Sequence, residues 1–167
     1  MPLLILVTGG TFDKVYCELD EQLELRKTHV PNMLKLGRNR KKLRIRTLMM
    51  KDSLLMTNRD RKKILGAVLK AEEKQVIITH GTGTMAETAR FLGPKVRGNT
   101  VVLTGAMIPF TLGSSDGLFN LGSAIAFAQT LPNGVYIAMN GRHFNWDNVR
   151  KDVGKGVFET LKKGRNQ

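Results

Sequence analysis

Four short apolar runs, each rich in β-branched residues, constrain the fold of this chain more than any other feature of the sequence. A continuous apolar run without alternation is typical of a strand that is buried on both faces, as in a parallel sheet. A fifth run, Leu43–Met49, alternates apolar and polar residues, which predicts a strand with one wetter face. The four apolar runs are Leu3–Val7, Val76–Thr79, Val101–Thr104 and Val135–Met139.

Helical patterns lie between these runs. Residues 58–74 and 115–130 carry apolar side chains at helical spacing, and residues 31–36 form a shorter candidate helix. Thr84–Glu87 has the form of a capping box, and Gly93-Pro94 would end the helix that starts there. Strands that alternate with helices predict an α/β fold, with a mainly parallel sheet flanked by helices.

The length of 167 residues suits one compact domain, which we assign to residues 1–161, followed by a tail at 162–167 and no C-terminal domain. A single cysteine, Cys17, excludes an internal disulfide framework and fits a reducing compartment. The apolar N-terminus lacks the basic region and cleavage site of a signal peptide. No run approaches the roughly 20 apolar residues of a membrane span. We therefore expect a cytoplasmic protein without membrane contact.

The net charge of +13 is the one unusual bulk property. A dense basic face attracts nucleic acid or anionic lipid, so a nucleic-acid-associated protein is one alternative. However, only 6% of the residues are aromatic, and rings do not alternate with arginines as they do in single-strand binders. We interpret the charge as a solvated surface and do not expect a nucleic-acid partner. The densest basic run holds Arg38, Arg40, Lys41, Lys42, Arg44 and Arg46.

Three of the predicted buried strands run into loops that pair glycine with hydroxyl residues: Val7–Phe12, Thr79–Thr84 and Thr104–Pro109. Ligands of open α/β sheets bind beyond the carboxyl ends of the strands, where these loops would lie. Glycine allows close approach to the backbone, and a threonine becomes a nucleophile if a base takes its proton. One such loop alone is an ordinary turn, but three at one edge of a sheet predict a site.

Two other kinds of site are less well supported. Residues Gly81–Ala86 fit the G-x-G-x-x-A dinucleotide motif, but Val101–Ala106 lacks the acidic residue that would hold the ribose. His29, His80 and His143 lack metal-ligand spacing. The sequence therefore predicts no cofactor and no metal.

Lys151 follows the fourth apolar run. An exposed lysine is usually solvated surface, but near a threonine in a closed pocket it can accept a proton with a lowered pKa. Its position in the sequence leaves both readings open.

Several segments, in order along the chain, resemble bacterial-type L-asparaginases. The first signature of that family is TGGT followed by an apolar residue, and the second normally reads HGTDTM. The likeness runs from about Leu3 to Phe158. It is carried by Thr8–Phe12, Lys51–Met56, Thr79–Met85, Val101–Pro109, Ser115–Leu121 and Val149–Lys151.

The resemblance implies an amidohydrolase that converts asparagine, and glutamine weakly, without a cofactor. Thr11 would be the nucleophile, and Tyr16 would hydrogen-bond Thr11 and help to close the site. Ser53 would bind the substrate α-carboxylate. Thr82 would position the attacking water together with Lys151.

The resemblance further implies that backbone groups orient the amide and stabilise the oxyanion, at Gly10, Gly81, Gly83 and Ala106. Members of the family also carry a second domain and assemble as oligomers. We therefore expect a short, single-domain form that is a homo-oligomer.

Position 83 departs from the family signature. Gly83 stands where the family has an aspartate that binds the substrate ammonium. Loss of such a charge partner typically costs ~2–5 kcal/mol. The alternative within this fold is thus a weakened or inactive asparaginase-like binding protein.

Overall fold

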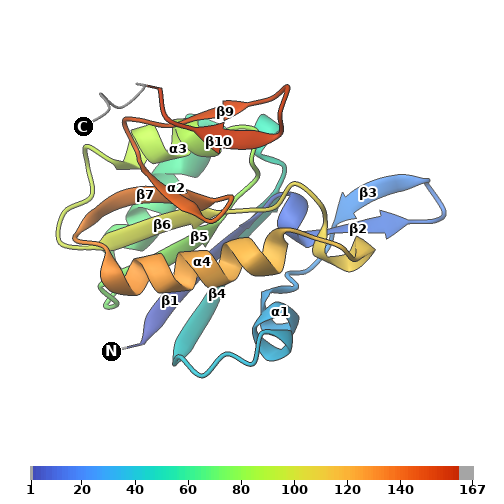
Figure 1. Cartoon of the computed structure of the whole chain (residues 1–167), viewed down its shortest axis with the longest axis horizontal. Helices are drawn as coiled ribbons and strands as arrows, with labels where there is room; N and C mark the ends of the chain where they lie inside the picture. The colour runs from blue at the N-terminus through green and yellow to red at the C-terminus, as the bar shows by residue number, and fades with distance from the viewer. Residues whose placement is uncertain (1, 162–167) are drawn as a thin grey trace.

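The computed structural model describes residues 2–161, which are built around a six-stranded sheet in the order β4-β1-β5-β6-β7-β8 (Figure 1). The first five strands in this order are parallel, and β8 runs antiparallel to β7. The predicted mainly parallel sheet is confirmed. The strands are β1 (Leu3–Gly9), β4 (Leu43–Lys51), β5 (Gln75–Thr79), β6 (Thr100–Thr104), β7 (Gly134–Met139) and β8 (Arg142–Asn145).

Four helices cover both faces of this sheet within the described residues (Figure 1). Helices α2 and α3 pack on one face, and α1 and α4 pack on the other. This two-sided cover explains why the central strands are apolar without alternation. The helices are α1 (Val30–Leu36), α2 (Asn58–Leu69), α3 (Met85–Leu92) and α4 (Gly117–Thr130).

Strand β1 illustrates how the core forms. Leu4 and Leu6 join the apolar cluster beneath α2 and α3, whereas Leu3, Ile5 and Val7 join the cluster beneath α1 and α4. All five side chains are at most 5% exposed. Full burial of each such side chain contributes about 1.5–3 kcal/mol, so this strand anchors both halves of the core.

Strand β4 is present as predicted, but its alternation has another cause. It lies at the edge of the sheet, and residues 44–47 are exposed on both faces. Arg44 pairs with Glu73 at 2.9 Å and with Glu72 at 3.7 Å. The charged residues of this strand thus suit an uncovered edge rather than a strand with one buried face.

The predicted capping box at Thr84 is wrong, although α3 begins directly after this residue and ends before Gly93. The Thr84 hydroxyl donates instead to the Ser53 carbonyl at 2.8 Å. A capping box does form at the start of α2, where Thr57 and Asp60 exchange hydrogen bonds. Thr84 therefore ties two loops together instead of capping its helix.

Two small hairpins were not predicted. Strands β2 (Lys14–Cys17) and β3 (Gln22–Leu25) form one, and β9 (Arg150–Asp152) and β10 (Val157–Glu159) form the other. Their strands are three or four residues long and only partly buried, so they carry little apolar signal. Within residues 2–161, no helix is long and apolar enough to cross a membrane. The predicted tail at 162–167 lies outside the described residues.

Candidate active site

The strand order reverses at β1, because the chain passes from β1 to β4 on one side and then to β5 on the other. Ligands of open α/β sheets bind at such a switch point, beyond the carboxyl ends of the strands. A cavity of about 190 Å³ lies there, formed mainly by the loops that follow β1, β4 and β5. Its lining consists of Gly10, Thr11, Lys14, Asp52, Ser53, Leu54, Gly81, Thr82, Gly83 and Lys151.

Most of the predicted site residues meet at this cavity, and two do not. Ala106 is fully buried in the core on the α1 and α4 side of the sheet. Tyr16 lies on β2 with 55% of its surface exposed, and its hydroxyl makes no hydrogen bond to Thr11 in the described structure. The roles predicted for these two residues stay predictions. The seven that line the cavity are Gly10, Thr11, Ser53, Gly81, Thr82, Gly83 and Lys151.

The loops around the cavity touch through glycine. Gly10 has a φ of 86°, and a Cβ atom there would lie 2.4 Å from the Gly81 backbone nitrogen. A Cβ atom on Gly81 would lie 2.5 Å from the Ser53 hydroxyl oxygen. Any side chain at these positions would push the loops apart, so close packing requires both glycines, and the positive φ of Gly10 favours glycine there as well.

Thr11 begins a 3-10 turn that is anchored by its neighbours. Phe12 and Asp13 are fully buried. The Asp13 carboxylate accepts hydrogen bonds from the His29 backbone at 2.7 Å and from the Thr28 hydroxyl at 3.1 Å, while burial raises the pKa of Asp13. Within residues 2–161 the Thr11 hydroxyl itself makes no hydrogen bond. It is therefore free to meet a ligand in the cavity.

Thr82 is bonded directly to a lysine. The Lys151 ammonium, which reaches in from β9, donates to the Thr82 hydroxyl oxygen at 2.8 Å. Partial burial lowers the pKa of Lys151 because it disfavours the charged form. A hydroxyl beside an amine with a lowered pKa is a recognised arrangement for moving a proton.

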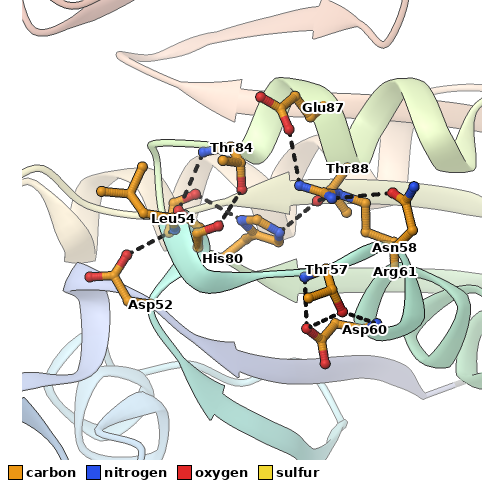
Figure 2. Close-up of polar contacts among 12 residues, drawn as sticks. Asp52, Leu54, Thr57, Asn58, Asp60, Arg61, His80, Thr84, Glu87 and Thr88 are labelled. Carbon is orange, nitrogen blue, oxygen red and sulfur yellow. Dashed lines mark hydrogen bonds and ion pairs between the residues drawn. The ribbon is translucent and has the colours of Figure 1, made fainter.

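A buried histidine, His80, supports the loop after β5 that carries Thr82 (Figure 2). His80 Nδ1 donates to the Gly81 carbonyl at 2.8 Å, and its Nε2 accepts from the Thr88 hydroxyl at 2.8 Å. Desolvation lowers the pKa of His80 to about 4, so the ring is neutral near pH 7. The Nδ1 tautomer follows because a carbonyl can only accept.

Arg61 extends this network to the surface. Its Nε donates to the Thr88 hydroxyl at 3.1 Å, and its terminal nitrogen pairs with Glu87 at 3.1 Å (Figure 2). The sequence pattern did not reveal this network, because its residues lie on two helices and a loop. A histidine directly after a buried strand was the one available signal.

Lys14 and Asp52 are two further cavity residues that sequence reasoning missed. Their side chains form an ion pair at 2.9 Å. The other Asp52 oxygen accepts from the Leu54 backbone at 3.0 Å, and the bond from Lys14 is the main cause of a lowered pKa for Asp52. Charged side chains are usually solvated, so nothing in the spacing of Lys14 and Asp52 distinguished them.

One group of potential metal ligands occurs among the described residues. Atoms of Cys17, Asp20 and Glu24 lie within 4.8 Å of one another on the β2–β3 hairpin. The Arg26 guanidinium already occupies this group, with its Nε 3.0 Å from Glu24 and another nitrogen 3.6 Å from the Cys17 sulfur. The group lies outside the cavity, and Arg26 already pairs with its Glu24 carboxylate.

The switch point of this α/β sheet holds two threonine hydroxyls, a lysine amine and glycine-rich loops, which are groups that acyl transfer can use. The model of the asparaginase N-terminal domain matches residues 2–159 of the sequence. The chain therefore belongs to the asparaginase family.

Individual relatives agree with this family assignment. The chain is 32% identical to the L-asparaginase of Thermococcus kodakarensis over 168 residues, which is 96% of this chain and 51% of that protein. The solved structure of the thermostable L-asparaginase from Thermococcus kodakarensis matches with a TM-score of 0.84, covering 100% of this chain and 57% of that one.

Two further solved structures match the same region. A probable cytoplasmic L-asparaginase from Campylobacter jejuni matches with a TM-score of 0.79 at 28% identity, covering 95% of this chain and 52% of that one. L-asparaginase I from Vibrio cholerae matches with a TM-score of 0.83 at 25% identity, covering 99% of this chain and 55% of that one. The chain thus spans about half the length of the relatives it matches.

Proposed function

We propose that this domain hydrolyses a side-chain amide, as its relatives named L-asparaginases do, and converts asparagine to aspartate and ammonia. The observation that carries the proposal is the cavity itself. It brings an unbonded threonine hydroxyl, Thr11, to the same small space as the bonded pair of Thr82 and Lys151.

In the first half of the reaction, Thr11 Oγ1 attacks the side-chain amide carbon. The C–N bond breaks, the amide nitrogen takes up the hydroxyl proton, and ammonia leaves an ester on Thr11. The negative charge on the amide oxygen needs donors that are already in place. The backbone N–H groups of Gly81 and Gly83, which line the cavity, suit that role, whereas the Gly10 N–H already donates to the Lys51 carbonyl at 3.1 Å.

In the second half, water attacks the ester carbon. The C–O bond to Thr11 breaks, and the hydroxyl regains a proton. Thr82 would hold this water, and Lys151 would accept its proton, because a lowered pKa increases the fraction of neutral amine. Ser53, which lies in the lining, would bind the substrate carboxylate.

Two predicted roles require more than the cavity. Tyr16 is largely exposed and makes no hydrogen bond to Thr11 in the described structure, so its role requires its side chain to move. Ala106 would act only through its backbone, because its side chain belongs to the core. Both roles remain part of the proposal.

A homo-oligomer in the cytoplasm completes the proposal. Exposed apolar side chains on the loop after β6 and on the first turn of α4 offer a surface for association: Met107, Ile108, Leu112 and Phe119. The relatives' names point to more than one compartment, since one is a probable cytoplasmic enzyme and another a probable periplasmic one. Light scattering of the purified chain tests the oligomer, and a monomer at working dilution would contradict it.

The test of function is ammonia release from asparagine, measured beside a Thr11→Ala variant. We expect turnover in the natural sequence and none above background in the variant. Glutamine is expected to be the weaker substrate. Equal ammonia release from both proteins would contradict the threonine mechanism.

Position 83 favours one alternative, a binding protein with weakened or no turnover. Gly83 offers no carboxylate, and Leu54 fills the adjoining space, 2.8 Å from where a Cβ atom would stand. Binding of aspartate without ammonia release from any amide would support this alternative.

A further inference from the structure

The charges that line the cavity are unequal. Lys14 and Lys151 bring two amines, whereas Asp52 is the one carboxylate among the lining residues of the described chain. Within residues 2–161, no acidic side chain lies within salt-bridge distance of Lys151, whose bonded partner is the Thr82 hydroxyl. With Lys151 protonated, the cavity carries a surplus of one positive charge.

Asp52 is already bonded. One oxygen accepts the Lys14 ammonium at 2.9 Å, and the other accepts the Leu54 backbone N–H at 3.0 Å. A ligand ammonium would have to compete with both bonds while lying close to Lys14. Like charges at such short range are unfavourable, so Asp52 is a poor receptor for an amino group.

Other carboxylates near the site are also committed. Asp116 accepts hydrogen bonds from the backbones of Met107 and Ile108, each at 3.0 Å. Glu87 pairs with Arg61 at 3.1 Å and lines an adjoining cavity of about 440 Å³, which shares Leu54, Thr82, Gly83 and Lys151 with this one. Even if Lys151 is neutral, a substrate ammonium finds no unpaired carboxylate in the cavity lining that residues 2–161 form.

The same lining suits a ligand carboxylate. Ser53 offers a buried hydroxyl, and Lys14 and Lys151 offer N–H donors. The glycine loops add backbone groups without bulk around the cavity of about 190 Å³. An anionic amide is therefore complementary to this cavity, whereas a zwitterion brings one charge that has no partner.

We propose that this cavity selects side-chain amides of dicarboxylic acids that lack an α-ammonium group, of which succinamate is the simplest, in preference to asparagine. The inference rests on the proposed amidohydrolase function and specifies its substrate class. The reaction stays balanced: succinamate and water give succinate and ammonium. Thr11 Oγ1 forms an ester as the C–N bond breaks, and water then cleaves the ester C–O bond.

The main experiment compares kcat/KM for succinamate and L-asparagine in the unmodified chain, with Thr11→Ala as the background. We expect succinamate to exceed asparagine by about ten-fold or more, since an unpaired buried charge typically costs one to two powers of ten in affinity. An asparagine value equal to or above that for succinamate would overturn the inference while leaving the amidohydrolase function intact.

Product binding distinguishes failure of the inferred preference for succinamate from failure of the proposed amidohydrolase function. If neither amide releases ammonia above the Thr11→Ala background, the proposed function is wrong. Calorimetric titration with succinate and with L-aspartate then decides the selectivity. Tighter binding of succinate supports the inference, and equal or weaker binding overturns it.

Two matched variants at position 83 test the cause. Gly83→Asp adds a carboxylate, and Gly83→Asn adds the same shape without charge. A new Cβ atom would lie 2.8 Å from the end of the Leu54 side chain and 3.2 Å from the Ser53 hydroxyl, so Leu54, which is 74% exposed, must move aside. We expect Gly83→Asp to raise the asparagine-to-succinamate ratio about ten- to a hundred-fold, and Gly83→Asn to raise it far less.

An unchanged ratio in a folded Gly83→Asp protein would overturn this account of position 83. Lys14→Met provides a second route that leaves the loop after β5 intact. It removes one cation and frees an Asp52 oxygen, so it too should shift the ratio towards asparagine. If circular dichroism indicates that the position 83 variants are unfolded, Lys14→Met and the unmodified chain decide the question. No shift in Lys14→Met would count against the charge argument.

Discussion

The two threonine loops of the cavity lie side by side but are supported differently. In the loop after β1, the neighbours of Thr11 are buried and its hydroxyl is unbonded within the described chain. In the loop after β5, Thr82 is bonded to Lys151, and His80 fixes the backbone from behind. The loop after β1 positions an unbonded hydroxyl, whereas the loop after β5 holds a hydroxyl that is already bonded to Lys151.

This difference suggests a division of labour between the loops. A free hydroxyl at a glycine turn can approach a substrate carbon, as a nucleophile must. A hydroxyl bonded to a lysine can hold a water and pass on its proton. Substitutions in or near one loop or the other test this division, and they follow in order of decreasing expected effect.

The largest effect is expected from Thr11→Ala. It should lower amide turnover by at least about a thousand-fold, since loss of a nucleophile removes the covalent route. The fold should persist, because the lost hydroxyl makes no hydrogen bond and stability depends on Phe12 and Asp13. Rapid-quench ammonia assays with either amide should detect no burst.

A matched control is Thr130→Ala, at the far end of α4, where the hydroxyl bonds only to the backbone of its own helix. This variant should retain full turnover. A burst of ammonia in Thr11→Ala would indicate that the nucleophile lies in the loop after β5 instead.

The second largest effect is expected from Lys151→Met. It should lower kcat by about a hundred-fold, a typical value for loss of a proton acceptor. In the unmodified chain the rate should rise with pH as the amine becomes neutral. Because burial lowers the pKa of Lys151, that rise should lie below the ordinary value of 10.5. The variant should lose this limb of the profile of kcat against pH.

If kcat still rises with pH in Lys151→Met, a group other than Lys151 must titrate in that range. The acylation burst provides a further check on the comparison. It should survive in Lys151→Met if this lysine serves mainly the water step. Loss of both burst and turnover would show that Lys151 also serves the first step.

The fold was largely predictable because its central strands are buried on both faces. That burial demands apolar runs such as Leu3–Val7, and such runs are visible in the sequence. The short hairpins β2–β3 and β9–β10 were missed because they bury little. Strand β4 was predicted, but its charged residues reflect its position at the edge of the sheet rather than one solvent-exposed face.

The site was predictable in part for a similar reason. Glycine and hydroxyl residues after a buried strand signal a loop that must admit a ligand, which led to Thr11 and Thr82. Lys14, Asp52 and the His80 network could not be found in this way. Their importance depends on contacts between segments far apart in the chain, such as the Lys14–Asp52 ion pair.

A third prediction concerns the support behind the second loop. The pKa of His80 is lowered to about 4 in the folded protein, against 6.5 for an ordinary histidine. Between these values the unfolded chain binds a proton that the folded chain does not, so stability falls as pH falls from about 6.5 to about 4. The loss from this group is roughly 3 kcal/mol and is absent above the window.

The measurement is urea unfolding at pH 7 and pH 4 for the unmodified chain and for His80→Gln, whose amide can donate and accept in the same places. The variant should lose about 3 kcal/mol less between the two pH values. Asp13, whose pKa is raised, acts in the opposite direction but equally in both proteins, so it cancels. Identical pH dependence in the two proteins would contradict a neutral buried His80.

The smallest effect is expected at the outer end of the same network, from Glu87→Gln. Glu87 is 62% exposed, whereas its partner Arg61 is 8% exposed. Because water screens the exposed carboxylate, the pair should contribute only about 0.5 kcal/mol. Arg61 keeps its bond to Thr88, so the orientation of His80 should not change.

The midpoint of thermal unfolding should fall by only about 1–2 °C in Glu87→Gln. Arg61→Leu provides the contrast, because it removes the donor to Thr88 from a buried position and should cost clearly more. Turnover should be unaffected in Glu87→Gln, since this side chain lies outside the 190 Å³ cavity. If Glu87→Gln were as damaging as Arg61→Leu, the loop after β5 would depend on the surface ion pair rather than on the buried bonds of His80.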